Sequence, residues 1–147
     1  MNHLHSPYLL VVEDSDEDFE ALQRVLSRSC TDFHIDVKRC SCGDDALELM
    51  RKESTSSKNA HLPSLVLLDL NLPGTDGREV LIEIKQDEVL KSIPVVILTT
   101  SSNPKDIQSC YRYGANSYLI KPMDVQQLKT TVCSTMDYWL KIVALPG

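Results

Sequence analysis

No stretch of the 147-residue chain is apolar over the ~20 residues that a membrane-spanning helix requires. Clusters of Lys and Arg are also missing and the net charge is −6, which argues against nucleic acid as a direct partner. Residues 1–6 lack both the basic start and the apolar stretch of a signal peptide. We therefore expect a cytoplasmic protein that binds neither membrane nor nucleic acid.

The five cysteines are odd in number and irregularly spaced, so they do not suggest a disulfide framework. Cys40 and Cys42 could supply two zinc ligands, but neither a second pair nor a nearby His completes such a site. We expect reduced thiols, as in most cytosolic proteins.

Short apolar runs alternate with segments of helical periodicity, over a length typical of one domain. Strands are expected at residues 8–12, 34–38, 65–70, 95–98 and 117–120. Helices are expected at about 15–29, 46–50, 80–84, 104–114 and 124–143. This order predicts a single α/β domain over 1–147, with its core at about 8–139, a C-terminal extension of the last helix at 140–147, and a parallel sheet covered on both faces. Two further expectations are that Gly43 interrupts the chain before the second helix, and that 53–61 form a polar surface loop.

Acidic residues follow two of the expected strands. Glu13 and Asp14 come directly after the first strand, and Asp69 follows the third. Because the carboxyl ends of parallel strands meet at one edge of a sheet, these carboxylates would lie close together and repel one another without a cation. Ligation by oxygen alone fits Mg²⁺ better than Zn²⁺. The competing interpretation is that each acid is a solvated turn residue, which Asp69 disfavours because it follows four apolar residues.

Two more polar residues end strands at the same expected edge. Lys121 follows the fifth strand and could pair with a carboxylate or a phosphoryl oxygen. Thr99 ends the fourth strand and could donate its hydroxyl to the same group. Either residue alone would mean little.

Together these residues resemble the receiver domain of bacterial response regulators. The segments that carry the resemblance are 9–14 (LLVVED), 67–77 (LLDLNLPGTDG), 98–100 (LTT) and 118–122 (YLIKP). The intervals from Asp69 to Thr99 (99 − 69 = 30) and to Lys121 (121 − 69 = 52) are also those of receivers. The resemblance covers roughly Tyr8 to Trp139 and implies a flavodoxin-like (βα)₅ three-layer sandwich, with a five-stranded sheet of order 2-1-3-4-5.

The same resemblance implies roles for the residues at the sheet edge. Asp69 would accept a phosphoryl group from a phosphohistidine on a sensor histidine kinase. Asp14, Asp69 and the backbone carbonyl of Asn71 would bind Mg²⁺, with Glu13 acting mainly through metal-bound water. We expect a signalling protein that catalyses only its own phosphorylation and dephosphorylation.

The resemblance also implies a switch. Lys121 would hold the phosphoryl group, with a cis peptide before Pro122, and Thr99 and Tyr118 would be the switch pair. One residue departs from the family pattern: Thr100 stands where receivers usually have a small residue, which puts the rate of transfer in doubt.

The C-terminal segment is unusually apolar at 138–146. Tyr138, Ile142 and Leu145 fall largely outside the apolar stripe of the last helix. Either the segment covers its own core, or it takes part in a homodimer contact through the fourth and fifth helices and the fifth strand. The 69–73 segment, the polar loop before the third strand and the Tyr-Trp-Leu ending resemble the single-domain receivers that partner bacterial and cyanobacterial phytochromes, which implies a light-sensing kinase and a readout by protein contact.

Three other functions compete. A phosphorylation-independent interaction or dimerisation module on the same fold is one alternative. A flavin carrier is disfavoured because the acidic residues at 13–16 would repel a phosphate. A phosphohydrolase of the haloacid dehalogenase type is disfavoured because Asn71 stands where such enzymes have a second Asp.

Overall fold

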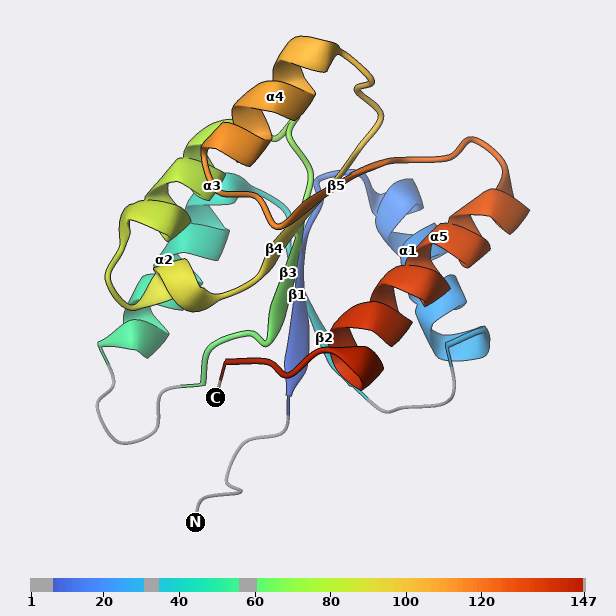
Figure 1. Ribbon diagram of the computed structural model, residues 1–147, viewed down its shortest axis with the longest axis horizontal. Helices are drawn as coiled ribbons and strands as arrows, with labels where there is room; N and C mark the ends of the chain where they lie inside the picture. Colours follow the sequence, from blue (N-terminus) through green and yellow to red (C-terminus); the bar gives the residue numbers. More distant parts are fainter. Residues whose placement is uncertain (1–6, 31–34, 56–60, 147) are drawn as a thin grey trace.

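The computed structural model describes residues 7–30, 35–55 and 61–146. Five parallel strands form one sheet in the order β2-β1-β3-β4-β5, which confirms the predicted fold (Figure 1). The strands are β1 (Tyr8–Val12), β2 (Asp36–Cys40), β3 (Leu65–Leu68), β4 (Val95–Thr99) and β5 (Ser117–Ile120). The helices are α1 (Asp16–Arg28), α2 (Gly43–Ser54), α3 (Gly77–Gln86), α4 (Pro104–Arg112) and α5 (Val125–Asp137), with a 3₁₀ turn η1 (Leu90–Ser92) and a π-helical turn η2 (Tyr138–Ile142).

Helices cover both faces of the sheet. Figure 1 shows α2, α3 and α4 on one side and α1 and α5 on the other. Successive strand residues point to opposite faces, so Leu10 and Val12 pack toward α2 and α3, while Leu9 and Val11 pack toward α1 and α5. Burial on both faces explains why β1, β3 and β4 are continuous apolar runs.

The strand register brings the predicted site residues to one edge. Val12 of β1 pairs with Leu68 of β3, so Glu13 and Asp69 follow at the same level of the sheet. The Asp69 N–H donates to the Val12 carbonyl at 3.1 Å. Strand order reverses at β1, because β2 and β3 lie on its two sides, and this is the point at which open α/β sheets bind ligands.

Polar side chains cap four of the helices that leave this edge, α1, α3, α4 and α5. Ser15 accepts from the Asp18 N–H and Asp124 from the Gln126 N–H. Asp76 and Asn103 cap α3 and α4 in the same way. Gly114, with φ of +107°, follows the end of α4 in the left-handed conformation that glycine favours.

Several boundaries differ from the predicted ones. The second strand lies at Asp36–Cys40 rather than 34–38, and residue 34 is outside the described residues. Gly43 begins α2 instead of interrupting the chain. The reason for a glycine here is the close approach of the chain, since a Cβ would lie 2.4 Å from the Thr75 carbonyl oxygen. Of the expected 53–61 loop, the first two residues belong to α2, and 56–60 lie outside the described residues.

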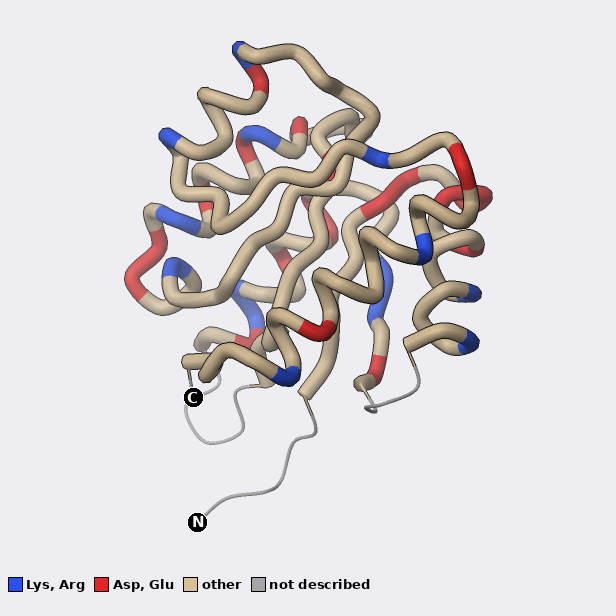
Figure 2. The backbone as a smooth tube through the Cα atoms, turned by 45° about the vertical axis from the view of Figure 1, so that its right-hand side comes forward, with Lys and Arg blue, Asp and Glu red and all other residues tan. Residues whose placement is uncertain are grey.

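Surface character agrees with the composition. In the view of Figure 2, Lys and Arg are interspersed with Asp and Glu rather than gathered in one stretch. Within the described parts of the chain, no helix is both long and apolar enough to cross a membrane.

Candidate functional site

Three carboxylates that are distant in the sequence converge where β1 and β3 end. Glu13, Asp14 and Asp69 each place one oxygen within 4.8 Å of the others. Glu13 and Asp69 are buried, with exposed fractions of 5% and 7%, while Asp14 is exposed. The acidic cluster predicted from the strand ends is therefore present, and the exposed Asp14 leaves it open to solvent.

Lys121 compensates the charge of this cluster. Its Nζ lies 2.5 Å from Glu13 Oε1, 3.1 Å from Asp69 Oδ2 and 2.9 Å from Asp18 Oδ2. Asp18 belongs to the first turn of α1. Its contact with Lys121 was not predicted, since the sequence explains an acid at this position by the helix dipole alone.

Burial and charge act against each other in this cluster. Burial raises the pKa of Glu13 to about 7, and the nearby Asp69 charge adds to this effect, while the hydrogen bond from Lys121 opposes it. For Lys121, burial lowers the pKa, but the hydrogen bonds to Glu13 and Asp18 and the charges of Asp69 and Glu13 outweigh burial and raise it. Lys121 is therefore a cation at neutral pH, held by three carboxylates.

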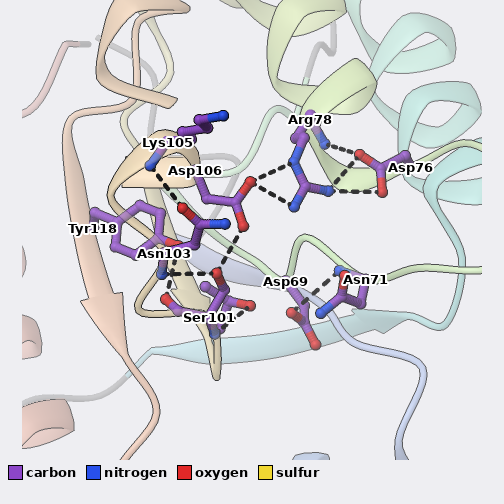
Figure 3. Close-up of polar contacts among 10 residues, drawn as sticks. Asp69, Asn71, Asp76, Arg78, Ser101, Asn103, Lys105, Asp106 and Tyr118 are labelled. Carbon is purple, nitrogen blue, oxygen red and sulfur yellow. Dashed lines mark hydrogen bonds and ion pairs between the residues drawn. The ribbon is translucent and has the colours of Figure 1, made fainter. Parts of the chain in front are cut away.

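The loop after β3 presents Asp69 and Asn71 on the same side, as Figure 3 shows. The Asn71 N–H donates to Asp69 Oδ1 at 3.4 Å, and Asn71 is exposed. Gly77 closes this loop, donating its N–H to the Leu70 carbonyl at 2.9 Å. A Cβ at Gly77 would lie 2.1 Å from the Asp69 carbonyl oxygen, so only glycine permits this close approach.

Thr99 and Tyr118 are connected through Ser101. Thr99 is fully buried at the end of β4, and its Oγ1 accepts the Ser101 N–H at 3.5 Å. The hydroxyl of the partly buried Tyr118 donates to the Ser101 carbonyl at 2.9 Å. The backbone N–H of Lys121 donates to the Thr99 carbonyl at 2.6 Å, so β5 delivers Lys121 to the level of Thr99. The structure thus brings together all the predicted site residues at one edge of the sheet.

A second polar network borders the site and was missed by the sequence reasoning. Ser101 Oγ donates to Asp106 Oδ2 at 2.7 Å, and Asp106 Oδ1 accepts from Arg78 Nη2 at 2.9 Å (Figure 3). Arg78 also pairs with Asp76 at 3.0 Å. The hydrogen bond from Ser101 and then those from Arg78 lower the pKa of Asp106. No spacing in the sequence indicates this link between α3, α4 and the loop after β4.

The peptide bond before Pro122 and the side chain of Thr100 are the remaining features of the predicted switch. The described residues contain no cis peptide bond, so the expected cis bond before Pro122 is wrong. Even before proline the trans isomer is the more stable one, by ~0.5–1 kcal/mol. Thr100, the departure from the family pattern, is exposed.

Comparison with known proteins agrees with this geometry. The model of the response regulator receiver domain matches residues 9–133. The chain belongs to this family.

The similar proteins include the cyanobacterial response regulators Rcp1 and RcpA. Response regulator Rcp1 of Synechocystis sp. is 42% identical over 95% of this chain and 92% of its own length. The crystal structure of the phosphorylated cyanobacterial phytochrome response regulator RcpA has a TM-score of 0.87 and 39% identity, covering 97% of this chain and 100% of that one. The Mn²⁺-bound form of Rcp1 has a TM-score of 0.84 and 40% identity, covering 96% and 99%. The acidic cluster of this receiver fits a divalent cation, as the residue types predict.

Proposed function

We propose that this receiver domain accepts a phosphoryl group on Asp69 from a sensor histidine kinase and signals through a protein contact. The carrying observation is the placement of the buried Asp69 carboxylate between Lys121, at 3.1 Å, and the acids Glu13 and Asp14. A buried carboxylate with one compensating lysine and an open acidic neighbour is arranged for a metal and an anion, rather than for packing.

In the transfer, an oxygen of Asp69 forms a bond to phosphorus as the bond to the donor imidazole nitrogen breaks, and the electron pair stays on the imidazole. Asp14, Asp69 and the Asn71 carbonyl would hold Mg²⁺, with Glu13 acting through water. The ion would neutralise the oxygens of the phosphoryl group. The protein supplies position and charge compensation, which such transfers chiefly need.

After transfer, the group on Asp69 carries about −1.5 to −2 charges. Lys121, now shared among carboxylates, would turn to the phosphoryl oxygens, and the buried Thr99 hydroxyl would donate to them. Tyr118 is already tied to the loop that follows Thr99. A switch that moves both Thr99 and Tyr118 would therefore rearrange the loop after β4, in which Ser101 contacts both residues.

The similarity to Rcp1 and RcpA supports a phytochrome as the kinase. A homodimer through α4, β5 and α5 is supported by exposed apolar side chains on and beside these elements. They are Tyr111, Tyr113, Ile120, Met123 and Val125, with exposed fractions from 40% to 98%. Tyr138 and Ile142 of η2, which follows α5, are also exposed apolar side chains, at 49% and 72%.

Phosphorylation by a small acyl phosphate tests the proposal directly. With Mg²⁺, intact mass should show one added phosphate on the wild type and none on Asp69→Asn. The exposed Asp45→Asn serves as the matched control and should be labelled like the wild type. Labelling that persists in Asp69→Asn would refute the acceptor, and sedimentation with and without the phosphodonor would show whether assembly follows phosphorylation.

A further inference from the structure

Two cysteines lie in contact on the α1–α5 side of the sheet. Cys30 follows the C-terminus of α1 and Cys133 belongs to α5, 103 positions later. Their Sγ atoms are 2.7 Å apart, and the structure gives this contact as a hydrogen bond in which either sulfur can donate. Cys30 is buried and Cys133 is partly exposed, so Cys133 is the more accessible residue of the pair.

We propose that Cys30 and Cys133 form a thiol-oxidation site, which a hydroperoxide converts to an intramolecular disulfide joining the end of α1 to α5. A disulfide places its sulfurs about 2.0 Å apart, so the two atoms need to approach by only about 0.7 Å. Both cysteines belong to the same packed cluster as Val25 and Met136, which holds the two helices in this relation.

The chemistry balances with hydrogen peroxide as oxidant. The thiolate of Cys133, the more accessible residue, attacks one peroxide oxygen; an S–O bond forms, the O–O bond breaks, and hydroxide leaves and is protonated to water. The thiolate of Cys30 then attacks the sulfenic sulfur; the S–S bond forms and the S–O bond breaks, releasing a second water. In total, the two thiols lose two protons and two electrons, and one peroxide becomes two waters.

The remaining cysteines are less suited to this reaction. Burial raises the pKa of the Cys40 and Cys110 thiols, which keeps them protonated and unreactive. Cys42 is partly exposed, like Cys133, and provides a comparison for accessibility alone. The selectivity for Cys133 therefore depends on Cys30 at its side.

The disulfide would close a loop that contains β2 to β5 and most of the site. A long closed loop restricts the unfolded chain more than a short one does, so the oxidised protein should resist unfolding. It would also fix α1, which carries Asp18, to the helix that follows Lys121. This proposal is independent of the proposed phosphorylation, because its test measures only thiol oxidation and thermal unfolding.

The test uses the full chain treated with hydrogen peroxide, then unfolded and alkylated. Intact mass should show three alkyl groups instead of the five of the reduced protein, and a peptide map without reductant should contain one linked pair, Cys30 with Cys133. Oxidation should raise Tm by about 10 °C, and a thiol reductant should reverse the rise.

Variants separate a specific pair from general thiol reactivity. Cys133→Ser should take four alkyl groups before and after peroxide and show no rise in Tm, whereas the control Cys42→Ser should lose two of its four on oxidation. Cys30→Ser repeats the test from the buried side. Five alkyl groups on the peroxide-treated wild type, or a linked pair other than Cys30 with Cys133, would overturn the proposal without any need for a variant to fold.

Discussion

Replacing Lys121 by Met removes a cation that contacts both buried acids of the site. Met keeps most of the length of the side chain, so packing is largely preserved. Without the lysine, Glu13 and Asp69 remain as two buried carboxylates with oxygens within 4.8 Å of each other. At an effective dielectric constant of about 20 their repulsion is roughly 332/(20 × 4.8), or about 3.5 kcal/mol. We therefore expect Lys121→Met to lower the free energy of unfolding by about 3 kcal/mol at pH 8, within the usual range for breaking a buried ion pair.

The loss should depend on pH in a defined direction. Burial already raises the pKa of Glu13 from 4.5 to about 7, and the hydrogen bond from Lys121, which lowers it, is absent in the variant. The pKa of Glu13 is higher in the folded state than in the unfolded state, so protonation of Glu13 stabilises the fold. This contribution is complete below pH 4.5 and disappears as the pH rises through the folded-state pKa. At pH 5.5 Glu13 should be protonated in the folded variant, and the difference from wild type should shrink to about 1 kcal/mol.

Urea unfolding at pH 5.5 and 8, each with EDTA and with Mg²⁺, measures these quantities. Mg²⁺ should restore part of the loss at pH 8, since it replaces the missing positive charge. Lys129→Met, at an exposed position of α5, is the control and should change the free energy of unfolding by less than ~0.5 kcal/mol. A loss below ~1 kcal/mol for Lys121→Met at pH 8 in EDTA, or an equal loss at both pH values, would contradict the electrostatic argument.

Three further changes test the surrounding structure. Gly77→Ala should lower the free energy of unfolding by more than ~3 kcal/mol, because its Cβ would meet the Asp69 carbonyl oxygen at 2.1 Å, whereas the exposed Glu79→Ala should be near neutral in the same thermal unfolding assay. Met136→Ala should cost ~2–5 kcal/mol in urea unfolding, since the side chain is fully buried between α5 and the sheet, and the 70% exposed Val125→Ala should cost far less. Asp106→Asn should lower the urea midpoint at pH 7, because the hydrogen bonds from Ser101 and Arg78 lower the folded-state pKa of Asp106. Its difference from wild type should shrink as the pH falls below the unfolded value of 3.8 and vanish below the folded-state pKa; a difference that stays the same from pH 7 to pH 3 would count against this network.

The fold was predictable because nearly every segment of the core carries its own local signal. The runs at β1, β3 and β4 are apolar throughout, and only a sheet covered on both faces buries such strands completely. Element boundaries were less certain where local preference and packing disagree. Gly43 is the clearest case: glycine usually weakens a helix, but here the close approach of the Thr75 carbonyl leaves no room for a Cβ, and the helix begins there.

Local signals also explain which site residues could be predicted. Parallel strands bring their carboxyl ends together, so polar residues that follow or end a strand could be found: Glu13, Asp14, Asp69, Thr99 and Lys121. Asp18, Ser101 and Asp106 could not, because their roles arise from side chains of different elements that meet only in the folded chain. The resemblance to receivers supplied the roles of the predicted residues.

Ser101 links Thr99, proposed to bind the phosphoryl group, to β5 and α4, two elements of the proposed dimer surface. Its N–H donates to Thr99 Oγ1 at 3.5 Å, a long bond that little free energy is needed to break. Under the proposed function, Thr99 gives up this bond when its hydroxyl turns to a phosphoryl group on Asp69. The same serine accepts the Tyr118 hydroxyl of β5 through its carbonyl and donates through Oγ to Asp106 of α4. Since β5 and α4 hold the loop at two atoms of one residue, a displacement of that residue must change the position of both elements or break a bond to one of them. Coupling between the acceptor and the α4–β5 surface therefore needs no long chain of contacts.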